Sequence, residues 1–376
     1  MQEPTLCIGV DVSKAELVIA MGPERRPCSV ANDAVSISNW LREIPAHALI
    51  AMESTGRYHG LLAHLASQAG LKVYVLNARD VFFYARALGT RAKTDGVDAG
   101  VIARYLVEHH GRLHPWQPGS SLQRRLQDLL ARRAQVVTHR SALRQVFTGI
   151  DTNDIDTASL QDAFDSVLQS IDHQVQALIA SDAQMAQGCE RLRTITGIGP
   201  QTSALLATLL SRFDFANADA LVAYSGLDPR PNDSGTKRGR RRLSKKGPPL
   251  LRRQMYLASF AASHSKALKP LYQSIRAKGF ATTEALVILG RKLLRVAFAV
   301  WKGNEVFDPA RLLPRETRRK HRTSDSCDAF PPAAALLGTA RRGWKPNTAR
   351  LRHCCGSSFG HCLAAEGEGA STGDGG

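Results

Sequence analysis

The chain has 376 residues, enough for two or three domains, and its 43% hydrophobic residues can form sizeable cores. The 50 Lys and Arg residues outnumber the 33 Asp and Glu residues, which gives a formal net charge of +17. This excess favours a polyanionic partner, because basic side chains that neutralise phosphates release bound counterions. Ribosomal and other non-enzymatic nucleic-acid binders share this balance, so charge alone does not establish catalysis.

The sequence gives no support for secretion or membrane insertion. The residues after Met1 are polar and do not form the basic and apolar regions of a signal peptide. No apolar run approaches the ~18 residues of a membrane span. The seven Cys residues are irregularly placed, which argues against a disulfide framework and favours a reducing, cytoplasmic environment.

Residues 5–112 show the alternation of strands and helices that is typical of an α/β domain. The expected strands are residues 6–10, 16–21, 26–30, 48–52 and 72–76, and the second and third of these can pair with the first as antiparallel neighbours. The expected helices are residues 33–41, 58–69 and 98–108. Asn32 or Asp33 can cap the first helix, and Gly70 can end the second. The pattern predicts a sheet covered by helices.

Residues 120–186 contain almost no Gly or Pro, and their apolar residues recur at helical spacing. A polar break near residues 152–157 predicts two long helices joined by a turn. Such a hairpin often dimerises as a coiled coil, but the heptads are imperfect. A dimer zipper and a simple intramolecular spacer are therefore both open.

Residues 190–307 are expected to form a second compact unit, mainly helical, and the texture changes again at Asp308. A basic cluster follows, and then Pro-, Ala- and Gly-rich segments that are typical of disorder. We therefore expect four parts, namely residues 1–115, 116–188, 189–307 and 308–376.

Four carboxylates in the N-terminal part are candidates for one site. Asp11 and Glu53 each follow an apolar run that is expected to form a strand. Asp95 and Asp98 lie three residues apart on one helix face, where like charges repel unless a cation lies between them. Each acid alone has an ordinary explanation, as a turn residue or at a helix N-terminus. Together they can supply the oxygen ligands that two Mg²⁺ ions need, and such ions assist phosphoryl transfer.

A glycine-rich segment lies between two helical patterns near residue 197. Gly197 and Gly199 permit a tight hairpin whose backbone N–H groups can hold a DNA phosphate. The segment resembles a helix-hairpin-helix, a motif that usually binds DNA without reading its sequence. An ordinary glycine-rich turn is the alternative.

Residues 236–253 hold nine Lys or Arg residues and no acid. A basic run is usually a solvated face, but this one lies within an expected domain and is flanked by Gly, which favours a phosphate-binding loop. Ser234 in that setting can act as a nucleophile, its hydroxyl acidified by nearby cations or a metal. A loop Ser in isolation is more often structural. The predicted nucleic-acid ligands of this run are Lys237, Arg238, Arg240, Arg241, Arg242, Lys245, Lys246, Arg252 and Arg253.

Several short motifs follow one another along residues 5–307. The first half contains Ile8-Gly9-Val10-Asp11-Val12-Ser13-Lys14, Met52-Glu53-Ser54-Thr55-Gly56, Lys93-Thr94-Asp95-Gly96-Val97-Asp98-Ala99 and Ile102-Ala103. The second half contains Gly197-Ile198-Gly199, Gly226-Leu227-Asp228-Pro229, Ser234-Gly235, Ser244-Lys245-Lys246-Gly247 and Leu251-Arg252-Arg253. Any one motif carries little weight, but the ordered set resembles the insertion sequence 110 (Piv-type) family of DEDD transposases.

The resemblance implies a RuvC-like, RNase H-type domain with a Mg²⁺ site, expected to hold two ions, at Asp11, Glu53, Asp95 and Asp98. It also implies that Ser234 attacks the scissile phosphodiester and becomes linked to DNA, while the metal site activates it and stabilises the leaving oxygen. Family members use a structured bridge RNA to choose donor and target DNA, and they assemble as dimers or tetramers through the helical hairpin. We therefore expect a bacterial transposase or recombinase that acts at the nucleoid.

The chain departs from the family pattern at two places. A second Ser-Gly pair occurs at Ser225-Gly226, where the family more often has Ala, and the spacing after Pro229 favours Ser234. The stretch beyond residue 308 is longer than the family pattern. A RuvC-like Holliday-junction resolvase or metal-dependent DNA nuclease, which needs the four acids and water but no serine, is the main alternative. A non-catalytic nucleic-acid-binding protein is a third.

Overall fold

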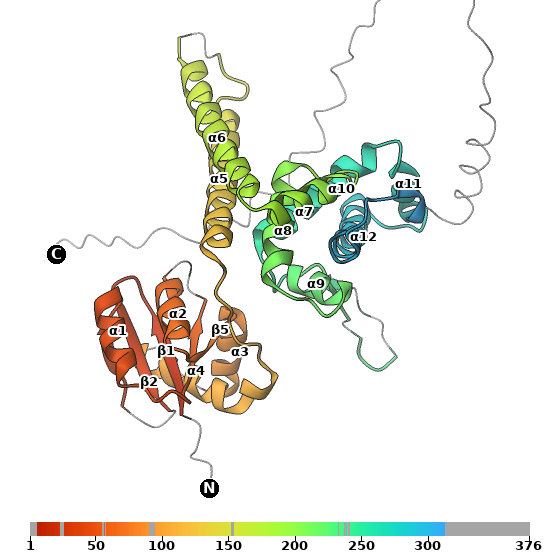
Figure 1. Ribbon diagram of the computed structural model, residues 1–376. Helices are drawn as coiled ribbons and strands as arrows, with labels where there is room; N and C mark the ends of the chain where they lie inside the picture. The colour runs from red at the N-terminus through yellow and green to blue at the C-terminus, as the bar shows by residue number, and fades with distance from the viewer. Residues whose placement is uncertain are drawn as a thin grey trace, which may run out of the picture. The chain divides into compact units, whose positions relative to one another are not determined.

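The computed structural model describes residues 6–312 apart from short gaps at 23–25, 55, 57, 90–94, 152–153, 232, 237–238 and 240, and it leaves the side chains of residues 95, 96 and 310 undescribed (Figure 1). One compact unit spans Met1–His321. The second, Arg322–Gly376, lies outside the described residues, as does the predicted tail from residue 313 onwards.

The N-terminal region is built on a mixed five-stranded sheet of order β3-β2-β1-β4-β5. Its strands are β1 (Cys7–Val12), β2 (Glu16–Met21), β3 (Cys28–Ala31), β4 (Leu49–Glu53) and β5 (Lys72–Leu76). Strands β1, β4 and β5 are parallel, whereas β2 pairs antiparallel with both β1 and β3. This mixed topology is RNase H-like, and it confirms the expected antiparallel neighbours of the first strand.

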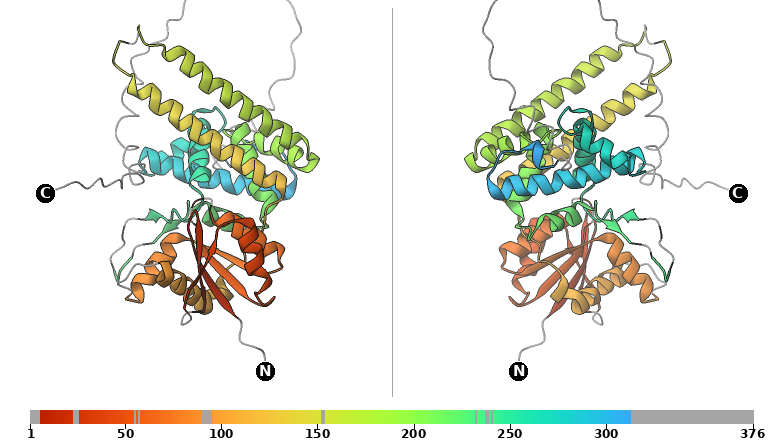
Figure 2. Two further views of the ribbon diagram at one scale, coloured as in Figure 1. Left: turned by 90° about the vertical axis from the view of Figure 1, so that its left-hand side faces the viewer. Right: turned by 90° about the vertical axis from the view of Figure 1, so that its right-hand side faces the viewer.

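Helices cover both faces of the sheet (Figures 1 and 2). They are α1 (Ala34–Arg42), α2 (His59–Gln68), α3 (Ala78–Ala87) and α4 (Asp95–His109), followed by the short 3₁₀ turn η1 (His110–Arg112). Asp33, one of the two residues expected to cap α1, is the N-cap. Its carboxylate accepts hydrogen bonds from the backbone N–H groups of Val35 and Ser36 at 2.9 Å each. Successive strand residues face opposite sides, so Val10 and Met52 pack in one core and Cys7 and Ala51 in the other.

Two strand ends differ from the expectation in a way that matters for the site. Strand β1 continues through Asp11, which pairs with Val18, to the buried Val12, which pairs with Leu17. Glu53 is the last residue of β4 and pairs with Leu76 rather than following the strand. The pairing partners on β2 and β5 therefore extend both strands past the apolar runs. The expected strands at residues 16–21 and 72–76 are confirmed with their boundaries.

The remaining described chain is mostly helical, with one small two-stranded sheet. Its elements are α5 (Ser121–Val146), α6 (Thr157–Ala180), α7 (Ala183–Arg193), α8 (Pro200–Arg212), α9 (Ala218–Ser225), β6 (Pro229–Arg230), β7 (Arg242–Leu243), α10 (Pro249–His264), α11 (Lys269–Arg276), α12 (Thr282–Gly303) and the 3₁₀ turn η2 (Pro309–Arg311). The long α5 and α6 lie side by side in every view (Figures 1 and 2), which confirms the expected pair of helices.

The helical region has its own continuous core, to which the inner half of the α5–α6 pair contributes Leu126, Leu130, Val175 and Ile179. Ion pairs hold the two long helices together, for example Arg133 with Asp172, where Nε and Nη2 donate at 2.5 and 2.9 Å to the two carboxylate oxygens. Within the described part of the chain, no helix has the length and apolar character that crossing a membrane would require.

Candidate functional site

Asp11 and Glu53 lie next to each other on neighbouring parallel strands. The register pairs Val10 with Met52, and Asp11 and Glu53 are the next residues along the two strands. Neighbouring strands lie about 4.8 Å apart. Val10 and Met52 point into the core under α1 and α2, so the alternation turns Asp11 and Glu53 to the opposite face, which α3 and α4 cover.

Helix α4 approaches that face closely because β1 has a glycine at the crossing. A Cβ atom at Gly9 would lie 2.2 Å from the carbonyl oxygen of Ala99 and 2.3 Å from the backbone nitrogen of Ala103. Cys7 of β1 and Ile102 of α4 belong to the same buried cluster on this face. Asp95 and Asp98 belong to the N-terminal turn of the same helix, and their approach to Asp11 stays a prediction.

The carboxylate oxygens are hard donors of the type that Mg²⁺ binds. Two acids side by side on one face also favour a bound cation, because like charges disfavour each other's ionisation. Nevertheless, within residues 6–312 as described, no three Asp, Glu, His or Cys side chains lie close enough together to hold a metal. The Asp95 side chain is outside the described residues. The structure thus brings Asp11 and Glu53 together by register, and it does not show a closed metal cage.

The two Ser-Gly pairs of the helical region have opposite environments. The Ser225 side chain is fully buried, where its hydroxyl donates to the carbonyl of Val222 at 2.7 Å and accepts from the N–H of Leu227 at 3.2 Å. Gly226, at φ 70°, then ends α9 in the left-handed region. Ser234, by contrast, is exposed. Ser225 is therefore part of a helix end, whereas Ser234 is the solvent-exposed member of the two.

Ser234 lies in the loop between β6 and β7. The short sheet pairs Pro229 with Leu243 and Arg230 with Arg242. The carboxylate of Asp233 accepts from the N–H of Gly239 at 3.2 Å and from Arg241 Nη2 at 3.0 Å, across the loop. Asp233 is not among the residues expected at the site, although an Asp before a Ser-Gly turn is a signal for local backbone hydrogen bonding.

The base of this hairpin is a tight junction of two glycine-containing segments. A Cβ atom at Gly247 would lie 1.8 Å from the carbonyl oxygen of Tyr224, so the backbones touch there. The Ser244 hydroxyl donates to the Asp228 carboxylate, and the half-buried Arg252 donates to the carbonyl oxygens of Ser225 and Gly247. Burial lowers the pKa of Arg252. The hydrogen bonds of Ser244 and Arg252 join the segment 225–228 to the segment 244–252, so the motif residues of the junction have a structural role.

The predicted nucleic-acid ligands of the basic run have mixed surroundings. Lys237, Arg238 and Arg240 lie outside the described residues. Arg241, Arg242, Lys245, Lys246 and Arg253 are exposed. Three of the exposed ones are also bonded, since Arg241 pairs with Asp233, Lys246 Nζ lies 2.5 Å from Asp80 Oδ1, and Arg253 donates to Thr138 Oγ1 at 2.8 Å. Contact with a nucleic acid stays a prediction for all nine.

The glycine-rich segment forms the turn between α7 and α8. Gly197 has φ 94°, and a Cβ atom there would lie 2.3 Å from the carbonyl oxygen of Ala258, so this glycine is required for packing against α10. Gly199 precedes Pro200 at the start of α8 and has open space around it. The room at Gly199 is compatible with a phosphate at this helix N-terminus, which stays a prediction.

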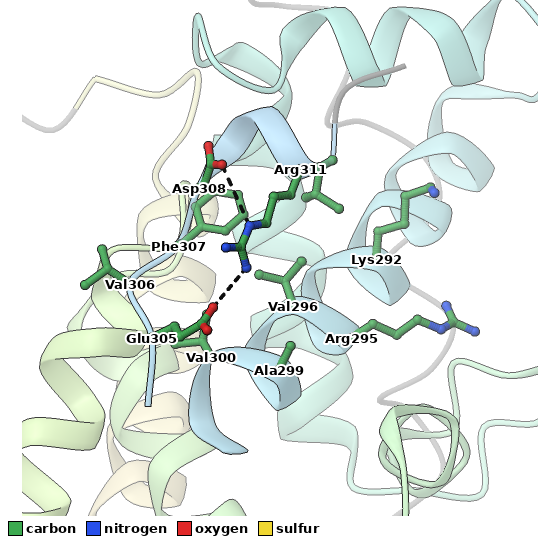
Figure 3. A pocket seen from close by; sticks show the side chains of 11 residues that line it. Lys292, Arg295, Val296, Ala299, Val300, Glu305, Val306, Phe307, Asp308 and Arg311 are labelled. Carbon is green, nitrogen blue, oxygen red and sulfur yellow. Dashed lines mark hydrogen bonds and ion pairs between the residues drawn. The ribbon is translucent and has the colours of Figure 1, made fainter. Parts of the chain in front are cut away.

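A pocket of about 300 Å³ lies elsewhere, beside the C-terminal half of α12 (Figure 3). Its floor is apolar, with Val296, Val300 and Phe307, and Arg311 on its rim contacts Glu305 at 2.9 Å and Asp308 at 3.8 Å. None of the predicted site residues lines it. This pocket is therefore separate from the candidate site.

Comparisons with known proteins agree with this architecture. A transposase family of DEDD type, from IS110, matches residues 8–150, and the transposase family IS116/IS110/IS902 matches residues 189–273. An RNase H-like sheet bearing an acidic edge, followed by a helical region with its own transposase signature, defines the class as a DNA transposase.

Several curated relatives match along most of their length. The pilin gene-inverting protein of Moraxella lacunata is 30% identical over 267 residues, which cover 69% of this chain and 81% of the relative. The protein of the same name from Moraxella bovis is 28% identical, covering 80% and 97%. A 42 kDa protein of insertion element IS900 from Mycobacterium paratuberculosis is 24% identical, again covering 80% and 97%. The chain belongs to the IS110 family of DEDD transposases.

Proposed function

We propose that this transposase cuts and rejoins DNA strands with Ser234 as the nucleophile, at a site where Asp11, Glu53, Asp95 and Asp98 hold Mg²⁺, expected as two ions. The observation that carries the proposal is the strand register, which pairs Val10 with Met52, the residues directly before Asp11 and Glu53. The exposure of Ser234, against the burial of Ser225, supports the choice of nucleophile.

The reaction is a transfer of a phosphoryl group to Ser234 and back. The Ser234 oxygen forms a bond to phosphorus as the bond to the leaving strand's oxygen breaks; the serine proton is lost, and the departing strand end takes up a proton as a hydroxyl. The hydroxyl of another strand end then attacks the serine-linked phosphorus, which rejoins DNA and frees the serine. Bound Mg²⁺ supplies acidification of the attacking hydroxyl and neutralisation of the phosphate charge.

The names of the Moraxella relatives support inversion of a DNA segment as one form of this reaction. We further propose a structured bridge RNA as the guide, since a net charge of +17 suits a protein that holds RNA and DNA together. The outer half of the α5–α6 pair exposes Val146 and Val167, and the connection between the two helices exposes Ile150. Exposed apolar side chains along a helical hairpin support assembly into a dimer or tetramer through it.

The test uses the full chain with a supercoiled plasmid carrying the element ends and their non-coding flanks. Asp11→Asn and Glu53→Gln are expected to abolish strand cutting and leave DNA binding within about twofold, because the carboxylates act on the reacting phosphate. Asp128→Asn, at an exposed acid on α5, is the matched control and should cut normally. Full cutting by Asp11→Asn would contradict the proposal and favour a binding protein.

Ser234→Ala separates this mechanism from the main alternative. It is expected to abolish both strand cutting and the covalent DNA–protein adduct that denaturing gels detect. A Ser234→Ala protein that still cuts DNA without forming adducts would show that water is the nucleophile, as in a resolvase or nuclease of the same fold.

A further inference from the structure

The outer face of α3 is aromatic and basic. Phe82 and Phe83 keep 55% and 51% of their surface exposed, and Arg79 and Arg86 on the same side are exposed as well. The inner face carries Val81, which is buried against the sheet. Exposure of two adjacent phenylalanine rings to water is unfavourable, and such an exposed apolar surface is typical of a binding site.

The four side chains are already arranged around one another. The Phe82 and Phe83 rings meet edge to face, with centroids 5.5 Å apart. Arg79 lies over the Phe83 ring at 5.4 Å and Arg86 over the Phe82 ring at 5.8 Å, measured from Cζ to the centroid. In the described part of the chain, neither guanidinium forms an ion pair with a carboxylate. Both cations therefore keep their charge available beside the rings.

Helix α3 begins beside the acidic edge of the sheet. Leu76 pairs with Glu53, and Asn77, directly after Leu76, caps α3. Helix α3 thus begins at the level of Glu53, and Phe82 follows about 6 Å further along the helix axis at 1.5 Å per residue. Helices α3 and α4 lie over the same face of the sheet (Figure 1). The alternation along β1 and β4 turns Asp11 and Glu53 to that face.

An unpaired base fits this chemistry better than a duplex or an apolar peptide. Exposed aromatic rings offer faces on which bases stack whatever their sequence, and flanking arginines neutralise the phosphates between them. A peptide would not need two unpaired cations at the rim. Strand exchange at the neighbouring acids requires DNA bases to leave their old partners before they join new ones.

We propose that Arg79, Phe82, Phe83 and Arg86 form a stacking platform for unpaired bases of the DNA strand that reacts at the acidic edge. The proposal rests on the proposed function for its choice of DNA strand. The platform holds bases on either side of the reacting phosphate while they have no pairing partner. It does not take part in bond making or breaking.

The test measures binding without chemistry, so that it does not depend on the catalytic mechanism. A single-stranded DNA 12-mer with one 2-aminopurine is titrated with the full chain in EDTA, because stacking on an aromatic ring quenches 2-aminopurine emission. The variants are Phe82→Leu/Phe83→Leu, which keeps apolar bulk without aromatic faces, and Phe82→Tyr/Phe83→Tyr, which keeps the faces. Phe280→Leu, at another exposed phenylalanine, is the matched control.

The Leu pair is expected to lose the quenching and to bind the 12-mer about tenfold or more weakly, with duplex binding within twofold. The Tyr pair and Phe280→Leu should behave like the parent chain. Thermal unfolding checks that each variant is folded, and because the Leu pair lies on the surface it should unfold within a few degrees of the parent.

Unchanged quenching and affinity in a folded Leu pair would overturn the proposal. So would a Leu pair that binds DNA normally but sediments as a smaller species, since α3 would then be an interface between copies of the chain. Quenching of 2-aminopurine in single-stranded RNA but not in single-stranded DNA would overturn the assignment of DNA as the bound nucleic acid. Quenching is measured in EDTA without strand cutting, so it does not depend on Ser234. A failure of the proposed serine mechanism is therefore distinguishable from a failure of the stacking platform.

Discussion

The sheet region and the helical region hold their candidate reactive groups in opposite ways. Asp11 and Glu53 lie on hydrogen-bonded strands of the sheet. Helix α4 packs closely over β1, because Gly9 has no Cβ atom to keep the two backbones apart. Ser234 lies on an exposed loop, and the rigid part of its surroundings is the glycine junction at the loop's base. We therefore expect changes at the crossing of β1 and α4 to act first on folding, and changes in the Ser234 loop to act on reaction rate.

The largest expected effect is a difference in alkylation rate between one buried thiol in each region and one exposed thiol. Cys7 in β1 and Cys189 in α7 are buried, whereas Cys28 is exposed. Burial raises the pKa of the Cys7 thiol and raises that of Cys189 to about 11. Because the thiolate is the reactive form, iodoacetamide at pH 8 should modify both at least about 10³-fold more slowly than Cys28.

Peptide-resolved mass spectrometry reads the three thiols separately, and Cys7 and Cys189 then report on opening of the sheet and helical regions. Raising the pH should keep accelerating Cys189 modification towards pH 11, whereas an ordinary thiol levels off above about 8.5. Modification of Cys7 at the rate of Cys28 would mean that β1 is not held as described.

The second effect is at the helix crossing. Gly9→Ala places a methyl group against the backbone of Ala99 and Ala103, so α4 must move away from β1. We expect a loss of about 3 kcal/mol in the free energy of unfolding, measured by urea denaturation. Gly60→Ala is the matched control, because Gly60 lies in α2 with open space around it. That change should stabilise by about 0.5–1 kcal/mol; equal stability of the two variants would refute the close approach.

The third effect compares the two serines. Ser225→Ala leaves the buried N–H of Leu227 without its acceptor, which should cost about 1–2 kcal/mol of unfolding free energy. Ser234→Ala removes an exposed hydroxyl and should change stability by no more than about 0.5 kcal/mol. Urea denaturation of both proteins decides the matter, and a larger loss from Ser234→Ala would reverse the assignment of structural and reactive serine.

The smallest effect on stability is expected in the Ser234 loop itself. Asp233→Ala removes an exposed pair with Arg241 and should cost about 0.5 kcal/mol or less. The same change frees the loop that carries Ser234, so we expect strand cutting to slow by about tenfold. Asp219→Ala removes another exposed pair, with Arg295, and should leave the cutting rate unchanged. Equal rates for the two variants would show that Asp233 does not position the loop.

Much of the sheet region could be predicted from the sequence, because alternation and capping are local signals. The strands at 16–21 and 72–76 and the Asp33 cap follow from such patterns. The full extent of β1 could not be predicted, since Asp11 and Val12 are held in the strand by partners on β2. Helix α3 was not expected, because two exposed phenylalanines on its outer face blur the apolar spacing of its inner face.

The candidate site divides in the same way. The four acids and Ser234 could be selected from motifs, and the order of those motifs led to the family. That Asp11 and Glu53 share one face depends on the pairing of β1 with β4, which is a long-range contact. The separation of Ser234 from Ser225 depends on burial, and the role of Arg252 in joining two loops depends on how the segments 225–228 and 244–247 meet.

The central claim, that a serine on the exposed loop becomes joined to DNA, has one direct measurement. The trapped adduct is digested with nuclease and protease, and mass spectrometry locates the residue that carries the remaining nucleotide. We predict that the nucleotide is attached to Ser234. Attachment to another residue, or cut DNA with no attached peptide, would contradict the mechanism.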